Sequence, residues 1–195
     1  MVEAKLGRPR SEATRHAILR AAAGLVDEIG YANITTTAIA TRAGAGKQTI
    51  YRWWRAKSSV IADAVVEGYL RLPSADVAVT GSLEDDLKAW LHVTVQVMND
   101  AATGPMVRAL AAAASDDAAQ ATALWDHLTG PLHRDLLNRL ERGQHAGQLS
   151  AAVDSAAIAD ALLGTVLFRL LAQAPNPARL DGIVDAVLGA SRPAG

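Results

Sequence analysis

Hydrophobic side chains recur every three to four residues along most of this chain, which is the spacing of one face of an α-helix. Alanine is abundant and clusters of β-branched or aromatic residues are scarce, and this composition favours helix over strand. The sequence therefore predicts an all-α fold. The predicted longer helices span residues 11–29, 57–72, 82–102, 105–114, 116–143, 154–173 and 176–191.

Several of these helices begin or change direction at recognisable signals. Ser82 and Asp154 each precede an apolar run, and their side chains can accept a hydrogen bond from a free backbone N–H of the first turn. Asn176-Pro177 is the same signal with proline at the first helical position. Gly130-Pro131 lies inside the helix predicted over 116–143. Because proline removes a backbone donor, we expect a kink or break there.

Residues 30–57 have a different pattern, with two short helical segments joined by a turn that contains two glycines. A threonine within 35–37 can cap the first segment. The turn is predicted at 43–46, where glycine accepts a positive φ without a Cβ clash. Ile50 and Trp54 are four residues apart and share the face that anchors the second segment. This is the layout of a DNA-binding helix-turn-helix, and an ordinary corner of two helices with a solvated polar face is the alternative.

The second short helix, which begins near Lys47, carries side chains that suit DNA. Gln48, Thr49 and Arg52 project away from the anchoring face. They are candidates for base contacts because glutamine pairs with adenine, arginine pairs with guanine, and threonine can hydrogen-bond or touch a thymine methyl. Three further side chains suit the sugar-phosphate backbone: Tyr51, Trp53 and Lys57.

The charge is divided along the chain, although the total is near zero, with 19 basic and 20 acidic side chains. Residues 1–60 hold ten basic and four acidic groups, a net of +6, and the remainder carries −7. This division favours DNA at the N-terminal end. It argues against a non-specific DNA-coating protein, which we expect to be basic throughout. Residues 5–10 form a basic arm that either enters the minor groove or serves as a solubilising tail.

The segment from about Ser11 to Ala64 resembles the N-terminal domain of the TetR family of bacterial transcriptional regulators. The residues that carry the resemblance are Ile18-Leu19-Arg20-Ala21-Ala22, Gly30-Tyr31 and residues 34–40, 43–54 and 57–61. The resemblance implies three DNA-binding helices, with the third in the major groove. It also implies backbone contacts from the positions of Thr36, Tyr51, Trp53 and Lys57. The full set of predicted DNA contacts is Thr36, Thr37, Lys47, Gln48, Thr49, Tyr51, Arg52, Trp53 and Lys57.

Two positions depart from the pattern of this family. Trp53 stands where the family often has Tyr or His, and its indole N–H could donate to a phosphate. Trp54 stands where the family often has Phe, and we expect its larger ring to remain in the core.

By the same resemblance, the remaining two thirds of the chain form a helical domain that binds a small molecule and dimerises. The predicted organisation is a flexible arm over 1–10, a helix-turn-helix domain over 11–56 and a ligand-binding and dimerisation domain over 57–195. The helices predicted over 154–191 are apolar on more than one side and need several neighbours. A homodimer would supply them and would match a two-fold operator, whereas burial within one chain is the alternative.

Large or pliable apolar residues outside the DNA-binding part are candidates for lining a pocket for a small apolar ligand. They are Trp90, Met98, Met106, Trp125 and Phe168. Each of them could instead be an ordinary core residue. His92, His127 and His133 could supply a polar contact or be surface histidines.

No sequence motif for catalysis stands out, and we predict no enzyme activity, no cofactor and no metal. His127 and His133 are six residues apart, which is not the spacing of a metal pair on one helix face. Neither a glycine-rich phosphate loop nor a Gly-x-Ser-x-Gly elbow is present. The chain has no cysteine, a charged N-terminus in place of a signal peptide, and no apolar run of roughly 20 residues, all of which fit the cytoplasm.

Together these features predict a sequence-specific transcriptional regulator. The working hypothesis is a homodimeric repressor that a small-molecule ligand releases from a palindromic operator. The alternative is a DNA-binding regulator without a small-molecule effector.

Overall fold

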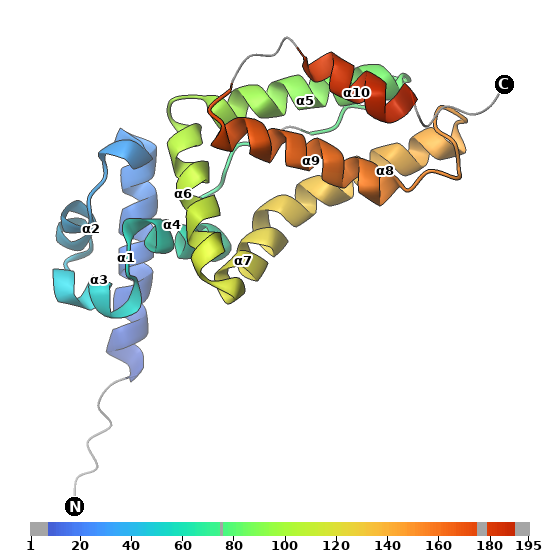
Figure 1. Cartoon of the computed structure of the whole chain (residues 1–195). Helices are drawn as coiled ribbons and strands as arrows, with labels where there is room; N and C mark the ends of the chain where they lie inside the picture. Colours follow the sequence, from blue (N-terminus) through green and yellow to red (C-terminus); the bar gives the residue numbers. More distant parts are fainter. Residues whose placement is uncertain (1–7, 75, 175–178, 190–195) are drawn as a thin grey trace, which may run out of the picture. The chain divides into compact units, whose positions relative to one another are not determined.

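The computed structural model describes residues 8–74, 76–174 and 179–189, with side chains from Glu12 onward. Every regular element in these ranges is helical, which confirms the all-α prediction (Figure 1). In chain order the elements are α1 (Arg8–Ile29), η1 (Tyr31–Asn33), α2 (Thr36–Ala43), α3 (Lys47–Trp53), α4 (Lys57–Val66), α5 (Leu83–Asn99), α6 (Thr103–Asp116), α7 (Ala118–Leu124), η2 (Trp125–Thr129), α8 (Gly130–His145), α9 (Ser155–Leu171) and α10 (Leu180–Gly189).

The chain divides into two compact units. The first comprises the residues up to Arg71 together with Pro105–Leu124, and the second comprises Leu72–Gly104 and the residues from Trp125 onward. The predicted boundary between 56 and 57 does not coincide with this division. Helix α4 packs along α1 and buries Val60 and Ile61 in the core of the first unit, so it belongs with the helix-turn-helix.

In the first unit α1 packs against both α2 and α4, and α3 follows α2 at the side of α1 (Figure 1). Helix α1 begins at Arg8, three residues before the predicted start. Residues 1–7 of the predicted basic arm lie outside the described residues. The fully buried side chains of this unit include Ile18, Leu19, Ile34, Ile39, Ile50 and Ile61.

Helix α4 ends at Val66, so the prediction that it continues to residue 72 was wrong. Gly68 adopts φ 75°, a left-handed conformation that ends a helix, and the Tyr69 N–H donates back to the Ala64 carbonyl at 2.8 Å. The extended segment between α4 and α5 is correspondingly longer than expected.

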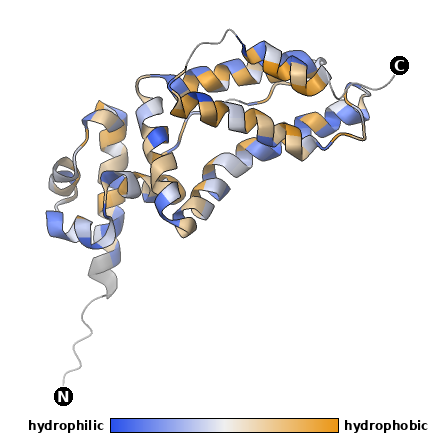
Figure 2. Ribbon diagram, in the orientation of Figure 1, coloured by the Kyte–Doolittle hydropathy of each residue, from blue (hydrophilic) through white to orange (hydrophobic). Residues whose placement is uncertain are grey.

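In the second unit α5 packs against α9 and α10, and α8 packs against α9. Figure 2 shows long hydrophobic segments on α9 and α10. The core side chains include Leu87, Leu91, Leu136, Leu140, Leu149 and Leu162.

Two of the three predicted helix caps in this unit are confirmed. The Ser82 side chain accepts from the Asp85 N–H at 3.2 Å, and the Asp154 carboxylate accepts from the Ala156 N–H at 2.9 Å. The predicted kink at Gly130-Pro131 takes the form of a π-helical turn, η2, directly before α8. Asn176-Pro177 lies outside the described residues, and α10 begins at Leu180.

Candidate nucleic-acid interface

The turn between α2 and α3 is built by local hydrogen bonds that the sequence encodes. The Thr35 hydroxyl accepts from the Ala38 N–H at 3.1 Å and starts α2. Gly44 ends α2 with φ 63° and ψ 29°, and the Ala45 N–H donates to the Ala40 carbonyl at 2.9 Å. A residue with a Cβ is strained in that left-handed conformation, which explains the glycine. The chain then enters α3 at Lys47, as predicted.

Helix α3 is anchored on one face and presents polar groups on the other. Ile50 and Trp54 are buried, which confirms their predicted anchoring role. Four side chains on the opposite side are exposed, namely Lys47, Gln48, Tyr51 and Arg52. Thr49 and Trp53 are half-buried, and the Arg52 guanidinium lies 5.9 Å from the Trp53 ring centroid. The short helix therefore offers hydrogen-bonding and cationic groups along one surface.

The first turn of α2 adds the two predicted threonines beside this surface. Thr36 is half-buried and Thr37 is exposed. Arg42, at the other end of α2, forms an ion pair with Glu28 at 2.5 Å, which holds α2 to the last turns of α1. Gly24 lies beneath this arginine, and a Cβ at that position would meet the Arg42 Nη2 atom at 3.0 Å. The charge of Arg42 is therefore paired within the protein and is not a free cation for DNA.

Lys57 is also engaged within the protein. Its ammonium donates to the carbonyls of Tyr31 and Ile34 at 3.0 Å each and lies 4.4 Å from the centroid of the Tyr31 ring. Burial lowers the pKa of the Lys57 ammonium. Because an ammonium has three N–H donors, one remains for a phosphate after these two bonds. The sequence predicts Lys57 as a cation for DNA, and no local pattern in it indicates that this side chain ties η1 to α4.

The five predicted ligand contacts differ in burial and are divided between the two units. Trp90 and Met98 are buried in the second unit, on α5, whereas Met106 is buried in the first unit. Trp125 is 47% exposed and Phe168 is 68% exposed. The Trp90 indole N–H has no hydrogen-bond partner among the described residues, although its atom is buried.

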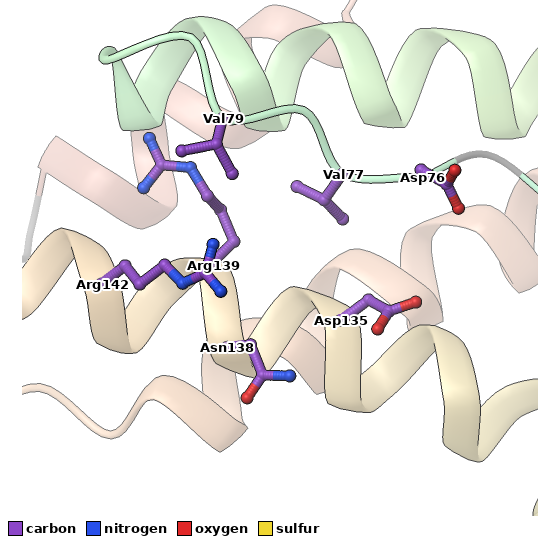
Figure 3. A pocket seen from close by; sticks show the side chains of 7 residues that line it. All are labelled: Asp76, Val77, Val79, Asp135, Asn138, Arg139 and Arg142. Atoms are coloured by element: carbon purple, nitrogen blue, oxygen red, sulfur yellow. The ribbon is translucent and has the colours of Figure 1, made fainter.

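A polar cavity of about 220 Å³ lies in the second unit (Figure 3). Its lining comes from the segment before α5 and from α8: Asp76, Val77, Val79, Asp135, Asn138, Arg139 and Arg142. None of the five predicted ligand contacts lines this cavity.

Arg139, which lines this cavity, belongs to a buried ion pair that the sequence analysis missed. Its Nη2 and Nε atoms each lie 2.7 Å from one Asp86 oxygen. Thr80 donates to the same carboxylate through its N–H and its hydroxyl. Burial raises the pKa of Asp86, but the hydrogen bonds from Thr80 and Arg139 outweigh burial and hold the net pKa below its ordinary value. The signal that could have revealed the pair is that Asp86 and Arg139 occupy apolar-face positions of their helices.

Two descriptions of known protein families match this chain. The family described as bacterial regulatory proteins, tetR family, matches residues 18–64. The family described as tetracyclin repressor-like, C-terminal domain, matches residues 77–187, which is more than half of the chain. The chain belongs to the TetR family. It is a transcriptional regulator with a DNA-binding helix-turn-helix, as the resemblance implied.

Curated TetR-type relatives cover most of the chain. The HTH-type transcriptional regulator YdeS of Bacillus subtilis (strain 168) is 32% identical over 171 residues, covering 87% of this chain and 84% of YdeS. The HTH-type regulator Rv1556 of Mycobacterium tuberculosis (strain ATCC 25618 / H37Rv) is 29% identical over 168 residues, covering 84% of this chain and 80% of Rv1556. These relatives are described as transcriptional regulators and not as enzymes.

Solved TetR structures share the fold. The TetR family transcription regulator SCO0332 has a TM-score of 0.61 and 29% identity, with 92% of this chain and 99% of that chain covered. FadR from Bacillus subtilis, solved in complex with stearoyl-CoA, has a TM-score of 0.56 and 16% identity, with 89% of this chain and 97% of FadR covered. At that identity the likeness to FadR concerns the fold alone. None of the described helices of this TetR regulator is long and apolar enough to cross a membrane.

Proposed function

We propose that this TetR regulator is a homodimeric repressor that binds a palindromic operator and is released from it by a small molecule. The observation that carries the proposal is the polar surface of α3, anchored from behind by Ile50 and Trp54. A regulator of DNA without a small-molecule effector is the second candidate. The two differ only in whether a ligand weakens operator binding.

In the proposed complex α3 enters the major groove. Gln48, Thr49 and Arg52 contact base edges, because their donors and acceptors match those of adenine, thymine and guanine. The remaining predicted contacts position the protein on the sugar-phosphate backbone. They are Thr36, Thr37, Lys47, Tyr51, Trp53 and the third N–H of Lys57.

The proposed dimer forms through α9 and α10. TetR regulators bind DNA operators and act as dimers. Helix α9 buries Ile158, Leu162, Val166 and Leu170, yet it leaves three large apolar side chains exposed at helical spacing: Leu167, Phe168 and Leu171. An exposed apolar patch of this kind marks an interaction site, and a two-fold axis would place it against itself. Phe168 is thereby reassigned from the ligand to the dimer interface.

Ligand control is supported by buried polar atoms in the second unit. Trp90 Nε1, Thr94 Oγ1 and Ser155 Oγ are buried and have no hydrogen-bond partner among the described residues. Trp90 and Thr94 are four residues apart on α5, which packs against α9, where Ser155 forms the first turn. An unpaired buried polar group costs about 1–3 kcal/mol, so a molecule that pairs with these groups gains affinity. We propose a ligand that combines apolar surface with hydrogen-bonding atoms.

The first test is selection of bound duplexes from random DNA, followed by measurement of the salt dependence of the best binder. We expect an inverted repeat whose half-sites are about one helical turn apart. Gln48→Ala should reduce the preference for the selected sequence by about 1–3 kcal/mol. Lys47→Ala, its neighbour, should weaken selected and random DNA equally if it contacts phosphate. If Gln48→Ala, like Lys47→Ala, weakens binding to selected and random DNA by the same factor, the assignment of Gln48 to a base is contradicted.

The ligand is tested by screening small molecules for release of the selected duplex. The repressor hypothesis predicts that an active compound weakens operator binding in the wild type. Trp90→Phe, which removes the indole donor and keeps an aromatic ring, should lower the response to that compound. Failure of a broad metabolite screen, with operator binding intact, would favour the second candidate.

A further inference from the structure

A single carboxylate connects the end of α3 to two other helices of the first unit. Trp54 directly follows α3, and its indole N–H donates to Asp63 Oδ2 on α4 at 2.8 Å. Arg15 on α1 donates from Nη2 to the same oxygen, also at 2.8 Å. One atom of Asp63 therefore accepts from both α1 and the end of α3.

Arg15 strengthens this junction in two further ways. Its Nη1 atom donates to the carboxylate of Glu67, the residue that directly follows α4. Its guanidinium carbon lies 5.7 Å from the centroid of the Trp54 ring, within the range of a cation–π contact. Burial lowers the pKa of Arg15, but the bonds to Glu67 and Asp63 outweigh burial and raise it overall, so the arginine stays charged.

The junction matters for α3 because that helix is short. It has seven residues, and its buried anchors are Ile50 in the middle and Trp54 just past its end. At its other end Gly46 provides no side-chain cap. The direction in which the polar face points therefore depends on how firmly Trp54 is held. Of the hydrogen bonds described for Trp54, the indole bond to Asp63 is the one that its side chain makes, and its ring also meets the Trp53 ring edge to face at 5.3 Å between centroids.

We propose that Asp63 is a positioning residue for DNA recognition, holding α3 through Trp54 at the angle from which its polar face meets the base edges. The carboxylate does not touch DNA in this role. Because Asp63 lies on α4, this bond ties the end of α3 to the position of α4. This inference rests on the proposed base contacts of α3.

The test compares three variants on two DNA duplexes, one selected by the wild-type protein from a random library and one of scrambled sequence. Trp54→Phe removes the indole donor but keeps a buried aromatic ring and the Arg15–Asp63 ion pair. Asp63→Ala removes the acceptor. Glu67→Ala is the matched control. It removes the other carboxylate that accepts from Arg15 but leaves the bond between Trp54 and Asp63 in place.

Affinities are measured at a temperature where circular dichroism shows each variant to be folded. Loss of one charge-assisted hydrogen bond should reduce the ratio of selected to scrambled affinity by about tenfold in Trp54→Phe and Asp63→Ala. A double variant that carries Trp54→Phe and Asp63→Ala should lose no more than Asp63→Ala alone, since both changes remove the bond between Trp54 and Asp63. Glu67→Ala should keep the wild-type ratio within about twofold, even if its melting temperature falls.

Two spectroscopic outcomes accompany these affinities. The indole N–H resonance that disappears in Trp54→Phe identifies Trp54, and this resonance should shift in Asp63→Ala but not in Glu67→Ala. If Trp54→Phe keeps the wild-type ratio, or Glu67→Ala lowers it as much as Asp63→Ala, the positioning role is overturned. If the wild-type protein selects no sequence at all, it is the proposed function that fails.

Discussion

Replacing Phe168 with alanine tests whether the exposed face of α9 is the dimer interface. This side chain is 68% exposed and stands between the exposed Leu167 and Leu171. A phenylalanine offers roughly 200 Å² of surface, so about 140 Å² remains to be buried in a dimer. At about 25 cal/mol per Å² this burial is worth about 3.5 kcal/mol per copy, and a two-fold interface contains two copies.

The expected loss is smaller than the sum for both copies. Alanine keeps the Cβ, and neighbouring side chains relax into part of the space, so area-based values are upper limits. We expect the variant to lose about 3 kcal/mol of dimer stability, which raises the dimer dissociation constant by about two orders of magnitude. Operator binding at low protein concentration should fall with it.

Sedimentation velocity over a concentration series measures the dissociation constant directly. Val93→Ala is the control, because Val93 is an exposed apolar residue on α5, outside the proposed interface. The control should dimerise like the wild type. An unchanged constant in Phe168→Ala, or an equal rise in both variants, would refute the assignment of the interface to this face of α9.

Three further substitutions probe the rest of the structure. Asp86→Ala leaves the Arg139 guanidinium buried without its carboxylate and should cost about 3–5 kcal/mol in urea unfolding followed by circular dichroism. The pKa of Asp86 is lowered in the fold, so the stability that this pair contributes is present above about pH 4 and is lost as pH falls through the lowered pKa. Acid unfolding of the wild type compared with Asp86→Asn checks this. Gly143→Ala would place a Cβ 2.6 Å from Leu83 Cδ2 and should cost about 1–2 kcal/mol of stability through overpacking, whereas an unchanged melting temperature would mean that Leu83 moves freely. Lys57→Met should lower stability by about 1–3 kcal/mol through two lost carbonyl contacts and reduce the salt slope of DNA binding by about one, and an unchanged slope would limit this lysine to its structural role.

The DNA-binding element could be predicted well because its signals are local. Thr35 caps α2, Gly44 ends it, and the spacing of Ile50 and Trp54 selects the buried face of α3. Each of these depends on the backbone conformation or side-chain direction of residues within one or two turns. The end of α4 shows the limit of such signals, because Gly68 was not recognised as a helix terminator.

The burial of the proposed ligand contacts could not be predicted in the same way. Trp90 and Phe168 are both large aromatic residues on apolar helices, yet one is 2% exposed and the other 68% exposed. Hydrophobic character alone does not distinguish a core position from an interface or a pocket. Only the packing of α5 and α9 against their neighbours separates them.

The sequence by itself determined the class of fold, the position of the helix-turn-helix and the polar face of α3, because these follow from periodicity, caps and glycine conformation. Tertiary structure alone decided the long-range pairs. Arg15 and Asp63 are 48 residues apart, and Asp86 and Arg139 are 53 residues apart. No spacing rule connects charges at such separations, and their partners are chosen only when helix packing brings them within hydrogen-bond distance.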